Sequence, residues 1–386
     1  MSATGVRTVL AGCSFAGLEL IYRLVRRNGR FAPGEMTVID PLEAHQYIPL
    51  AHEAAGSERG AAKLLFDAPA FCEAVGATVV RGSLERIDEE RRVVVLDGGR
   101  EVEYDRLVIA VGSVPDVPEQ FAKATNVIPV KFLDSAQAIR RRLHVLRVGG
   151  ASVQRVVVVG GGLTGVEWSA ELAAARVDGS RVATTLLCAN VRILPTFPIS
   201  IARSAARALR SLGVEILLSS RVAAVNAEHV VLQGGIGIPF DVVVWASGVR
   251  PNPVTATLGL PLTEDGHIVV NTHLAVEGRK DIYAVGDCSR IMDARGKAWP
   301  TMERAIEAIW EGAYLARHFA DGRSGDEGPP LRLRRDFFYG ISLGRRRGAV
   351  FYRSFIHVSR AALIFRRFLR WAYYARFRLL ARKVGV

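Results

Sequence analysis

The stretch Val6-Arg-Thr-Val-Leu-Ala-Gly12-Cys-Ser14-Phe-Ala-Gly17 joins a short apolar strand to a helix through a glycine-rich turn. A buried parallel strand followed by such a turn is typical of a βαβ unit that holds a pyrophosphate at the helix N-terminus. A second apolar strand, residues 36–40, ends in Asp40, 23 positions after Gly17. That spacing is close to the roughly 20 expected for a carboxylate that binds a ribose hydroxyl. The start of the chain therefore predicts a dinucleotide-binding domain.

The same pattern returns in Arg155-Val-Val-Val-Val-Gly160-Gly-Gly162-Leu-Thr164-Gly165. One glycine motif is weak evidence, but two motifs that each follow an apolar strand indicate two dinucleotide sites in one chain. The acid expected after the second strand of this unit is missing, because Cys188-Ala-Asn follows residues 183–187. A 2′-phosphate would meet no carboxylate there. The sequence therefore leaves the choice between NADH and NADPH open.

Composition limits the class of protein. The 386 residues are 49% hydrophobic, which is enough for two nucleotide-binding domains and a smaller third piece. Four cysteines without paired spacing exclude a disulfide scaffold and predict no metal site. No apolar run approaches the roughly 18 residues of a membrane span. The net charge of +13 is uneven: residues 331–386 contain 15 Lys or Arg and one acid, whereas residues 1–330 contain 36 basic and 37 acidic residues.

The remaining strands and helices predict how the two units are connected. An apolar strand closes on Gly112, and another ends in Gly286-Asp287, where the carboxylate can meet a sugar-alcohol chain. Helices are expected over 133–148, 199–212 and 301–320. We therefore predict an α/β fold with two Rossmann-like domains, the second inserted into a split first domain. The expected boundaries are 1–120 and 271–325 for the first domain, 121–270 for the inserted domain and 326–386 for a basic C-terminal region.

In motif order the chain resembles the two-dinucleotide flavoprotein reductases, in which FAD occupies the first glycine unit and NAD(P)H the second. Three further stretches are similar to type II NADH:quinone oxidoreductases, the single-chain, non-pumping dehydrogenases of respiratory membranes. They are Asp40-Pro-Leu-Glu-Ala-His-Gln-Tyr-Ile-Pro49-Leu50, Gly160-Gly-Gly-Leu-Thr-Gly-Val-Glu167 and Val244-Trp-Ala-Ser-Gly-Val-Arg250. The resemblance implies electron transfer from NAD(P)H through FAD to a membrane quinone, in two alternating half-reactions.

The resemblance also assigns residues to the two cofactors. The expected FAD contacts are Gly12, Ser14, Phe15, Ala16, Gly17, Asp40, Pro49, Val80, Ala110, Gly112, Gly286 and Asp287. The expected NAD(P)H contacts are Gly160, Gly162, Thr164, Gly165 and Gly248. Ser14 stands where the first motif usually has its middle glycine. Its small hydroxyl is compatible with FAD because it can donate a hydrogen bond to the pyrophosphate.

Reduction of a quinone consumes two protons, and a buried carboxyl with a raised pKa can supply or relay them. Glu167 and Glu311 are the predicted catalytic residues; the alternatives are a carboxylate favoured by the helix dipole for Glu167 and an exposed helix acid for Glu311. The pair of glutamines usual in the family's quinone-site helix is absent from residues 305–312. Cys288, expected at the start of a helix, is either a reactive thiolate or, as we favour, a small packed residue.

The basic C-terminus predicts an interfacial helix over residues 360–386. In a helical projection one side carries Ile364, Phe365, Phe368, Leu369, Ala372, Ala375 and Leu379. The other side carries Arg360, Arg366, Arg367 and Arg370, and Trp371, Tyr373 and Tyr374 lie toward the boundaries. Such a helix lies on an anionic lipid surface without crossing it. We therefore expect a peripheral protein on the cytoplasmic face of a membrane.

Nucleic acid is not expected, because no nucleic-acid-binding motif accompanies the basic segment, and a homodimer is compatible with the sequence. Two alternative functions remain open at this point. One is a membrane-tethered NAD(P)H-binding flavoprotein that acts as a sensor or interaction protein. The other is a reductase for a ferredoxin-like protein.

Overall fold

The computed structural model describes residues 5–384 except 57, 123, 150–152, 178–179, 333–337 and 354. The first domain is built on a five-stranded parallel sheet in the order β22-β9-β1-β2-β5. Its strands are β1 (Thr8–Ala11), β2 (Met36–Asp40), β5 (Thr78–Arg81), β9 (Arg106–Ile109) and β22 (Ile282–Ala284). The central strand β1 is buried along its whole length because helices cover the sheet. The last strand comes from a segment far along the chain, so the domain is split as predicted.

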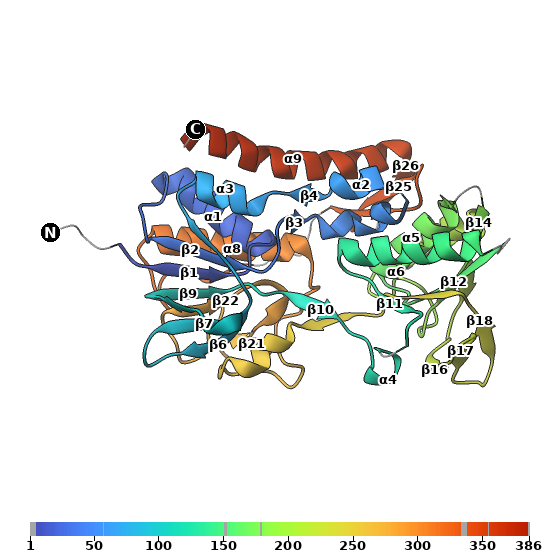
Figure 1. Ribbon diagram of the computed structural model, residues 1–386, viewed down its shortest axis with the longest axis horizontal. Coiled ribbons are helices and arrows are strands. Elements are labelled where there is room, and N and C mark those ends of the chain that lie inside the picture. Colours follow the sequence, from blue (N-terminus) through green and yellow to red (C-terminus); the bar gives the residue numbers. More distant parts are fainter. Residues whose placement is uncertain are drawn as a thin grey trace.

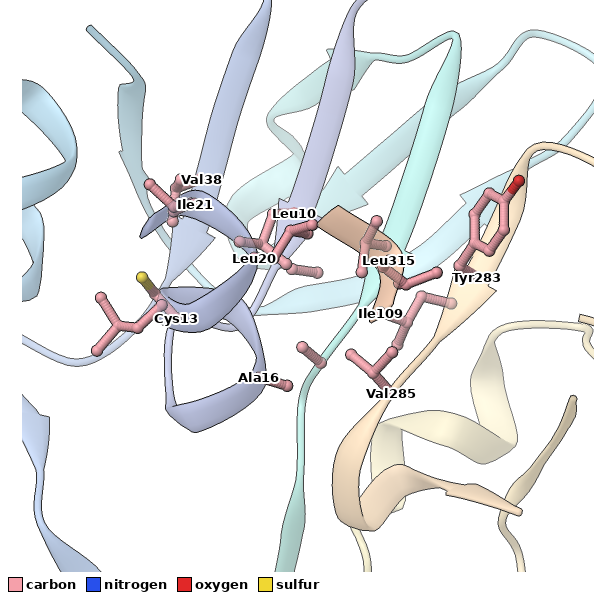
Figure 2. Close-up of a cluster of buried hydrophobic side chains, with 14 of the residues drawn as sticks. Leu10, Cys13, Ala16, Leu20, Ile21, Val38, Ile109, Tyr283, Val285 and Leu315 are labelled. Atoms are coloured by element: carbon pink, nitrogen blue, oxygen red, sulfur yellow. The ribbon is translucent and has the colours of Figure 1, made fainter. Parts of the chain in front are cut away.

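Two helices pack closely beside this sheet, α1 (Phe15–Asn28) and α8 (Ala305–Ala320). Figure 2 shows the core between them and the strands, where Leu20 of α1 and Leu315 of α8 lie near Leu10 and Ile109. Gly312 allows the close approach of the helices, since a Cβ there would lie 2.2 Å from the carbonyl oxygen of Ala16. The contact fixes α8 against the helix that follows the first glycine turn.

The inserted domain has its own parallel sheet in the order β11-β19-β12-β14, with β15 pairing with β14 on the far side. These strands are β11 (Val127–Pro129), β12 (Gln154–Val159), β14 (Ser180–Leu187), β15 (Glu215–Leu217) and β19 (Val242–Trp245). A short antiparallel strand, β13 (Arg176–Val177), also pairs with β14. The helices of this domain are α5 (Leu133–Val148), α6 (Leu163–Ala174) and α7 (Ile199–Ser211). The predicted Rossmann-like unit is therefore present.

The chain crosses between the domains on two strands that pair antiparallel, β10 (Ser113–Pro115) and β20 (Val249–Pro251). Residues beyond β20 pack into the core of the first domain; they are Leu258, Leu260, Ile268 and Val270. The inserted domain therefore ends near residue 250, earlier than the expected boundary at 270. The turn Pro251-Asn-Pro253 marks the crossing in the sequence, but only the packing of the residues after it shows to which domain they belong.

Smaller elements complete both domains. The first domain adds β6 (Leu84–Asp88), β7 (Val93–Leu96) and β8 (Glu101–Glu103), the pair β3 (His45–Gln46) and β4 (Leu65–Phe66), the pair β21 (Ile268–Val270) and β23 (Ser289–Ile291), and the helical segments η1 (Ile48–Gly56), α2 (Glu58–Ala62) and α3 (Ala68–Ala74). The inserted domain adds α4 (Glu119–Ala122), β16 (Val222–Val225), β17 (His229–Leu232) and β18 (Gly237–Pro239).

The C-terminal region forms an antiparallel sheet and one long helix. The strands are β24 (Tyr339–Ser342), β25 (Gly348–Tyr352) and β26 (Phe355–Ser359), and the helix is α9 (Arg360–Val384). Figure 1 shows α9 in red along one side of the molecule, over α3, β4 and α2. None of the helices in the described part of the chain has the length and apolar character that a membrane crossing requires.

Candidate active site

A cavity of about 770 Å³ lies where the first domain, the inserted domain and α9 meet. This volume is toward the upper end of the roughly 300–1,000 Å³ found for ligand sites. Its wall includes the first glycine turn, the Gly-Asp motif after β22, the start of α6, the segment before α8 and part of α9. The cavity thus brings together segments that the sequence analysis assigned to different ligands.

The first glycine turn is shaped for a pyrophosphate. Gly12 has φ +104°, and a Cβ there would lie 2.3 Å from the carbonyl oxygen of Ala110, so only glycine fits. Ser14 caps α1 without a side-chain hydrogen bond to the helix. The first N–H groups of a helix have no partner within it, and Ser14, Phe15 and Ala16 line the cavity, so the start of α1 suits a bound phosphate.

Asp40 stands at the end of β2, beside this turn. One carboxylate oxygen accepts a hydrogen bond from the backbone N–H of Cys13 at 2.6 Å, and the other accepts from that of Leu42 at 2.8 Å. Burial raises the pKa of Asp40, and the two N–H donors oppose that rise. The carboxylate is thus held rigidly at the cavity wall, where it can accept hydrogen bonds from ribose hydroxyls.

Most of the residues predicted to bind FAD lie around one cavity. Those that line it are Gly12, Ser14, Phe15, Ala16, Asp40, Pro49, Ala110, Gly112, Gly286 and Asp287. Two do not line it. A Cβ on Gly17 would lie 2.3 Å from the carbonyl oxygen of Gly12, so Gly17 allows the helix to pack under the turn, and Val80 is buried in the core.

A polar group surrounds Asp287 that was not predicted from the sequence. The Ser113 hydroxyl donates a hydrogen bond to the Asp287 carboxylate at 2.6 Å. The Lys131 ammonium lies 3.2 Å from the same carboxylate and donates to the Ser113 carbonyl oxygen at 2.8 Å. All three residues line the cavity. Lys131 lies between β11 and α5 of the inserted domain, and a lone lysine in that position carries no recognisable motif.

The second glycine turn has the same strand register as the first, but a cysteine stands beside it where the first turn has an aspartate. β12 pairs Val159 with Leu187 just as β1 pairs Ala11 with Ile39, so Cys188 occupies the place of Asp40. The thiol of Cys188 is buried. Its sulfur would lie 2.2 Å from a Cβ added at Gly161, so the glycine leaves room for it. Burial raises the pKa of this thiol, which keeps it neutral. The structure thus confirms that a neutral group replaces the expected carboxylate.

The residues predicted to bind NAD(P)H divide between the cavity and the second turn. Thr164 lines the cavity, whereas Gly160, Gly162, Gly165 and Gly248 are absent from its wall. A Cβ on Gly165 would lie 1.8 Å from the carbonyl oxygen of Gly160, so this glycine lets α6 pack against its own turn. The N-terminus of α6 therefore leads from the second turn to the cavity.

Glu167, on α6, is buried at the cavity wall in a polar cluster. It forms an ion pair with Arg366 of α9 and accepts a hydrogen bond from the backbone N–H of Ser342 at 2.8 Å. Nδ1 of His52 lies 3.8 Å from its second carboxylate oxygen, and burial lowers the pKa of that histidine. Arg366 also donates to the carbonyl oxygen of Pro49 at 3.0 Å. Arg366, which the helical projection placed opposite the apolar side chains, therefore lies on the side of the last helix that docks on the protein.

Glu311 lies outside the cavity wall. It is buried, and its carboxyl accepts a hydrogen bond from the backbone N–H of Gly286. Burial raises the pKa of Glu311 to about 8. The expectation of a helix beginning at Cys288 is wrong, because β23 follows this residue. Burial also raises the pKa of the Cys288 thiol to about 12, which agrees with the packed residue that we favoured and not with a thiolate.

The last helix combines a docked face with an exposed apolar one. Tyr373, Tyr374 and Phe377 are buried, and the ring of Tyr374 stacks on Phe66 with centroids 5.1 Å apart. The two tyrosines, expected toward the boundaries, thus pack into the protein because the helix docks on α1 and α3. The exposed large apolar side chains of the helix are Ile364, Phe365, Phe368, Leu369, Trp371 and Leu379. Leu369 is 44% exposed and also lines the cavity, so the cavity reaches this apolar face.

The family model of pyridine nucleotide-disulphide oxidoreductases matches residues 6–312 of the chain. Among characterised proteins, the type II NADH:quinone oxidoreductase of Haemophilus influenzae is 28% identical over 348 residues, covering 78% of this chain and 77% of that protein. The putidaredoxin reductase of Pseudomonas putida is 28% identical over 342 residues, covering 83% and 76%.

Among solved structures, NDH2 from Plasmodium falciparum in complex with NADH has a TM-score of 0.82 and covers 98% of each chain. Its sequence identity of 17% makes this a likeness of fold alone. The match extends over the whole two-domain architecture and the C-terminal region. It confirms the predicted fold class.

Proposed function

The chain belongs to the pyridine nucleotide-disulphide oxidoreductase family, and from this we propose that it is a flavoenzyme that carries electrons from NAD(P)H through FAD to a membrane quinone. The observation that carries the proposal is the single cavity that joins the first glycine turn, Glu167 of α6 and the apolar face of α9 at Leu369. The names of similar proteins agree, since the relative in Haemophilus influenzae is an NADH:quinone oxidoreductase.

The residues at the first turn fit FAD. The free N–H groups at the start of α1 would hold the pyrophosphate, Asp40 the ribose and Asp287 the sugar-alcohol chain. When bound, FAD accepts a hydride equivalent from NAD(P)H and returns its electrons to the acceptor. The second turn, with Gly160 and Gly165, would hold the pyrophosphate of NAD(P)H, and Gly248 is proposed to lie against the same cofactor. Lys131 and Ser113 keep the Asp287 carboxylate in place.

Glu167 is proposed as the proton relay of the acceptor half-reaction. It lies at the cavity wall, and Arg366 and the Ser342 N–H fix its carboxylate. His52 lies behind it, within 3.8 Å. Glu311, which was expected to donate or relay a proton, is proposed to have a structural role instead. Its contact with the Gly286 N–H makes it a positioning residue for the Gly286-Asp287 motif.

The apolar face of α9 is proposed to lie on the cytoplasmic surface of an anionic membrane. Ile364 is 65% exposed and Leu379 64% exposed, and they lie on the same helix as Phe368 and Trp371. Lipid would cover these side chains, and exposed basic residues of the helix, among them Arg360, Arg378, Arg382 and Lys383, would meet anionic headgroups. Quinone could then enter at Leu369 without leaving the bilayer. A homodimer stays a prediction.

The dehydrogenase proposal is tested by anaerobic stopped-flow measurement of flavin absorbance in the holoenzyme. We expect NADH or NADPH to bleach the flavin, and a short-chain quinone to restore its colour rapidly. Absence of bleaching with either nucleotide would refute the proposal. Rapid bleaching with slow reoxidation by quinone would instead favour the sensor function or a reductase for a ferredoxin-like protein. The similarity to putidaredoxin reductase makes that second alternative the one to test next.

The membrane proposal is tested by flotation with vesicles that contain anionic lipid. Truncation of α9 is unsuitable, because Tyr374 and Phe377 belong to the protein core. The double variant F365S/F368S removes only exposed side chains and should lower the bound fraction by at least about tenfold, since each lost aromatic contributes roughly 1–2 kcal/mol at an interface. I236S, which changes an exposed apolar residue of the inserted domain, should bind like the wild type. Equal binding of all three proteins would refute the proposal.

A further inference from the structure

Arg304 lines the cavity immediately before α8, and no motif in the sequence drew attention to it. Its guanidinium carbon lies 4.5 Å from the ring centroid of Tyr339 and 4.9 Å from that of Phe197. Such contacts are cation–π interactions, which favour a positive charge against an aromatic face. The arginine is therefore held between a ring of β24 and a ring that precedes α7.

The two rings are themselves rigidly packed. Tyr339 stacks on Phe351 of β25 with centroids 5.1 Å apart and an angle of 6° between the planes. Phe197 meets both rings edge to face, with centroids 5.5 Å from Tyr339 and 5.3 Å from Phe351. Because aromatic pairs in these arrangements attract one another, the guanidinium has a fixed support. Little side-chain entropy remains to be lost when it binds a ligand.

Arg304 has no ion-pair partner in the described part of the chain. Its Nη1 is buried and has no hydrogen-bond partner there, and no carboxylate lies within ion-pair distance of it. The other cavity arginine, Arg366, is paired with Glu167. Burial lowers the pKa of Arg304, with Glu167 and Glu307 opposing that effect, but a guanidinium stays protonated in proteins. An unpaired buried donor costs roughly 1–3 kcal/mol, and an acceptor oxygen bound there would remove that cost.

We propose that Arg304 binds the oxygen of the electron acceptor and stabilises the negative charge that this oxygen gains on reduction. The inference rests on the proposed quinone reductase function. A hydride equivalent from NAD(P)H adds two electrons and one proton to the quinone, which becomes a hydroquinone monoanion. Its charged oxygen faces Arg304, and Glu167 relays the second proton to it from solvent. The acceptor class is therefore a quinone whose oxygen reaches Arg304.

The proposal predicts a preference among ligands. A quinone with an ionised hydroxyl, such as the anion of 2-hydroxy-1,4-naphthoquinone, carries in its ground state the charge that an ordinary quinone gains only on reduction. It should therefore bind the oxidised holoenzyme more tightly than 1,4-naphthoquinone does. If Arg304 served only to join β24 to the inserted domain, the two ligands would not be distinguished.

The test compares R304Q with R317Q, which changes an exposed arginine of α8 that does not line the cavity. Isothermal titration with the two naphthoquinones gives the ratio of their dissociation constants for each protein. A charge-assisted hydrogen bond is worth roughly 1.5–3 kcal/mol, so R304Q should weaken the hydroxylated ligand about 10- to 100-fold and 1,4-naphthoquinone by less than about threefold. R317Q should match the wild type. Stopped-flow reoxidation by 1,4-naphthoquinone should slow about 100-fold in R304Q, while bleaching by NAD(P)H stays unchanged.

Several outcomes would overturn the inference. These are a wild type that binds the two ligands equally, an R304Q protein with the wild-type ratio, and equal weakening of both ligands. R304K keeps the charge and should retain part of the preference, and it replaces R304Q in the same comparison if the glutamine variant does not fold. Failure of the proposed function is distinguishable, because then no quinone reoxidises the wild-type flavin, whatever the binding ratio.

Discussion

Glu311 provides the sharpest test of the structure through the pH dependence of stability. The substitution is E311Q, which removes the charge and keeps an oxygen that can accept the hydrogen bond from the Gly286 N–H. Burial raises the pKa of Glu311 from 4.5 to about 8 in the folded protein. The folded state therefore holds a proton that the unfolded chain releases near its ordinary pKa, so the wild type loses stability as the pH rises from about 4.5 to 8.

The magnitude follows from the two pKa values. Each pH unit between them corresponds to about 1.4 kcal/mol, which sets a ceiling of about 5 kcal/mol on the loss. Local relaxation and water entry reduce this, and we expect about 2–4 kcal/mol between pH 5 and pH 8.5. For a chain of this size that corresponds to about 3–5 °C in Tm. The glutamine of E311Q does not titrate. The stability of E311Q relative to the wild type should therefore rise by this amount between pH 5 and pH 8.5.

The assay is thermal unfolding of the holoenzyme, followed by flavin fluorescence at pH 5 and pH 8.5. E264Q, which neutralises an exposed glutamate, serves as the control for the general effect of removing a negative charge. The two variants should diverge at the higher pH. A difference between E311Q and the wild type that stays constant within about 0.5 °C would refute the assigned burial of the charge, as would the same trend in E264Q.

Two further predictions follow from backbone contacts. G312A should lower the free energy of unfolding by about 1–3 kcal/mol and weaken FAD retention, because the new Cβ would lie 2.2 Å from the carbonyl oxygen of Ala16. Thermal unfolding and the amount of released flavin measure these two effects. The control is G234A, because no atom lies within 4 Å of a Cβ at that position. C188D restores the missing ribose carboxylate and should lower kcat/KM for NADPH relative to NADH about tenfold, roughly 1.4 kcal/mol; an unchanged ratio would contradict the equivalence of Cys188 and Asp40.

Local patterns in the sequence were sufficient for the two nucleotide-binding units. Apolar runs that end in glycine identify buried parallel strands, and the spacing to Asp40 identified its place at the end of β2. The sequence also showed that Cys188 replaces the expected acid, and the strand register places Cys188 at the position that corresponds to Asp40. These features depend on residues within about 30 positions of one another, where turn geometry and strand pairing leave few arrangements.

Contacts between distant segments were not predictable in the same way. The pairing of Arg366 with Glu167 joins residues 199 positions apart, and the helical projection, which placed this arginine opposite the apolar side chains, gave no indication of its partner. Such a projection shows which side chains share a face but not which face meets the protein. Tyr373 and Tyr374 illustrate the same limit, since an amphipathic ring fits an interface and a protein core equally well.

By itself the sequence determined the two glycine turns, the strands before them and the missing acid of the second site, because these follow from backbone sterics and hydrophobic periodicity over short stretches. Only the tertiary structure decided where the inserted domain ends, which face of α9 is exposed and which side chains surround the cavity. Arg304 is the clearest case: its aromatic support comes from residues before α7 and in β24. The physical reason is that burial and pairing of charges depend on how separate elements pack, and that packing is not encoded in local sequence spacing.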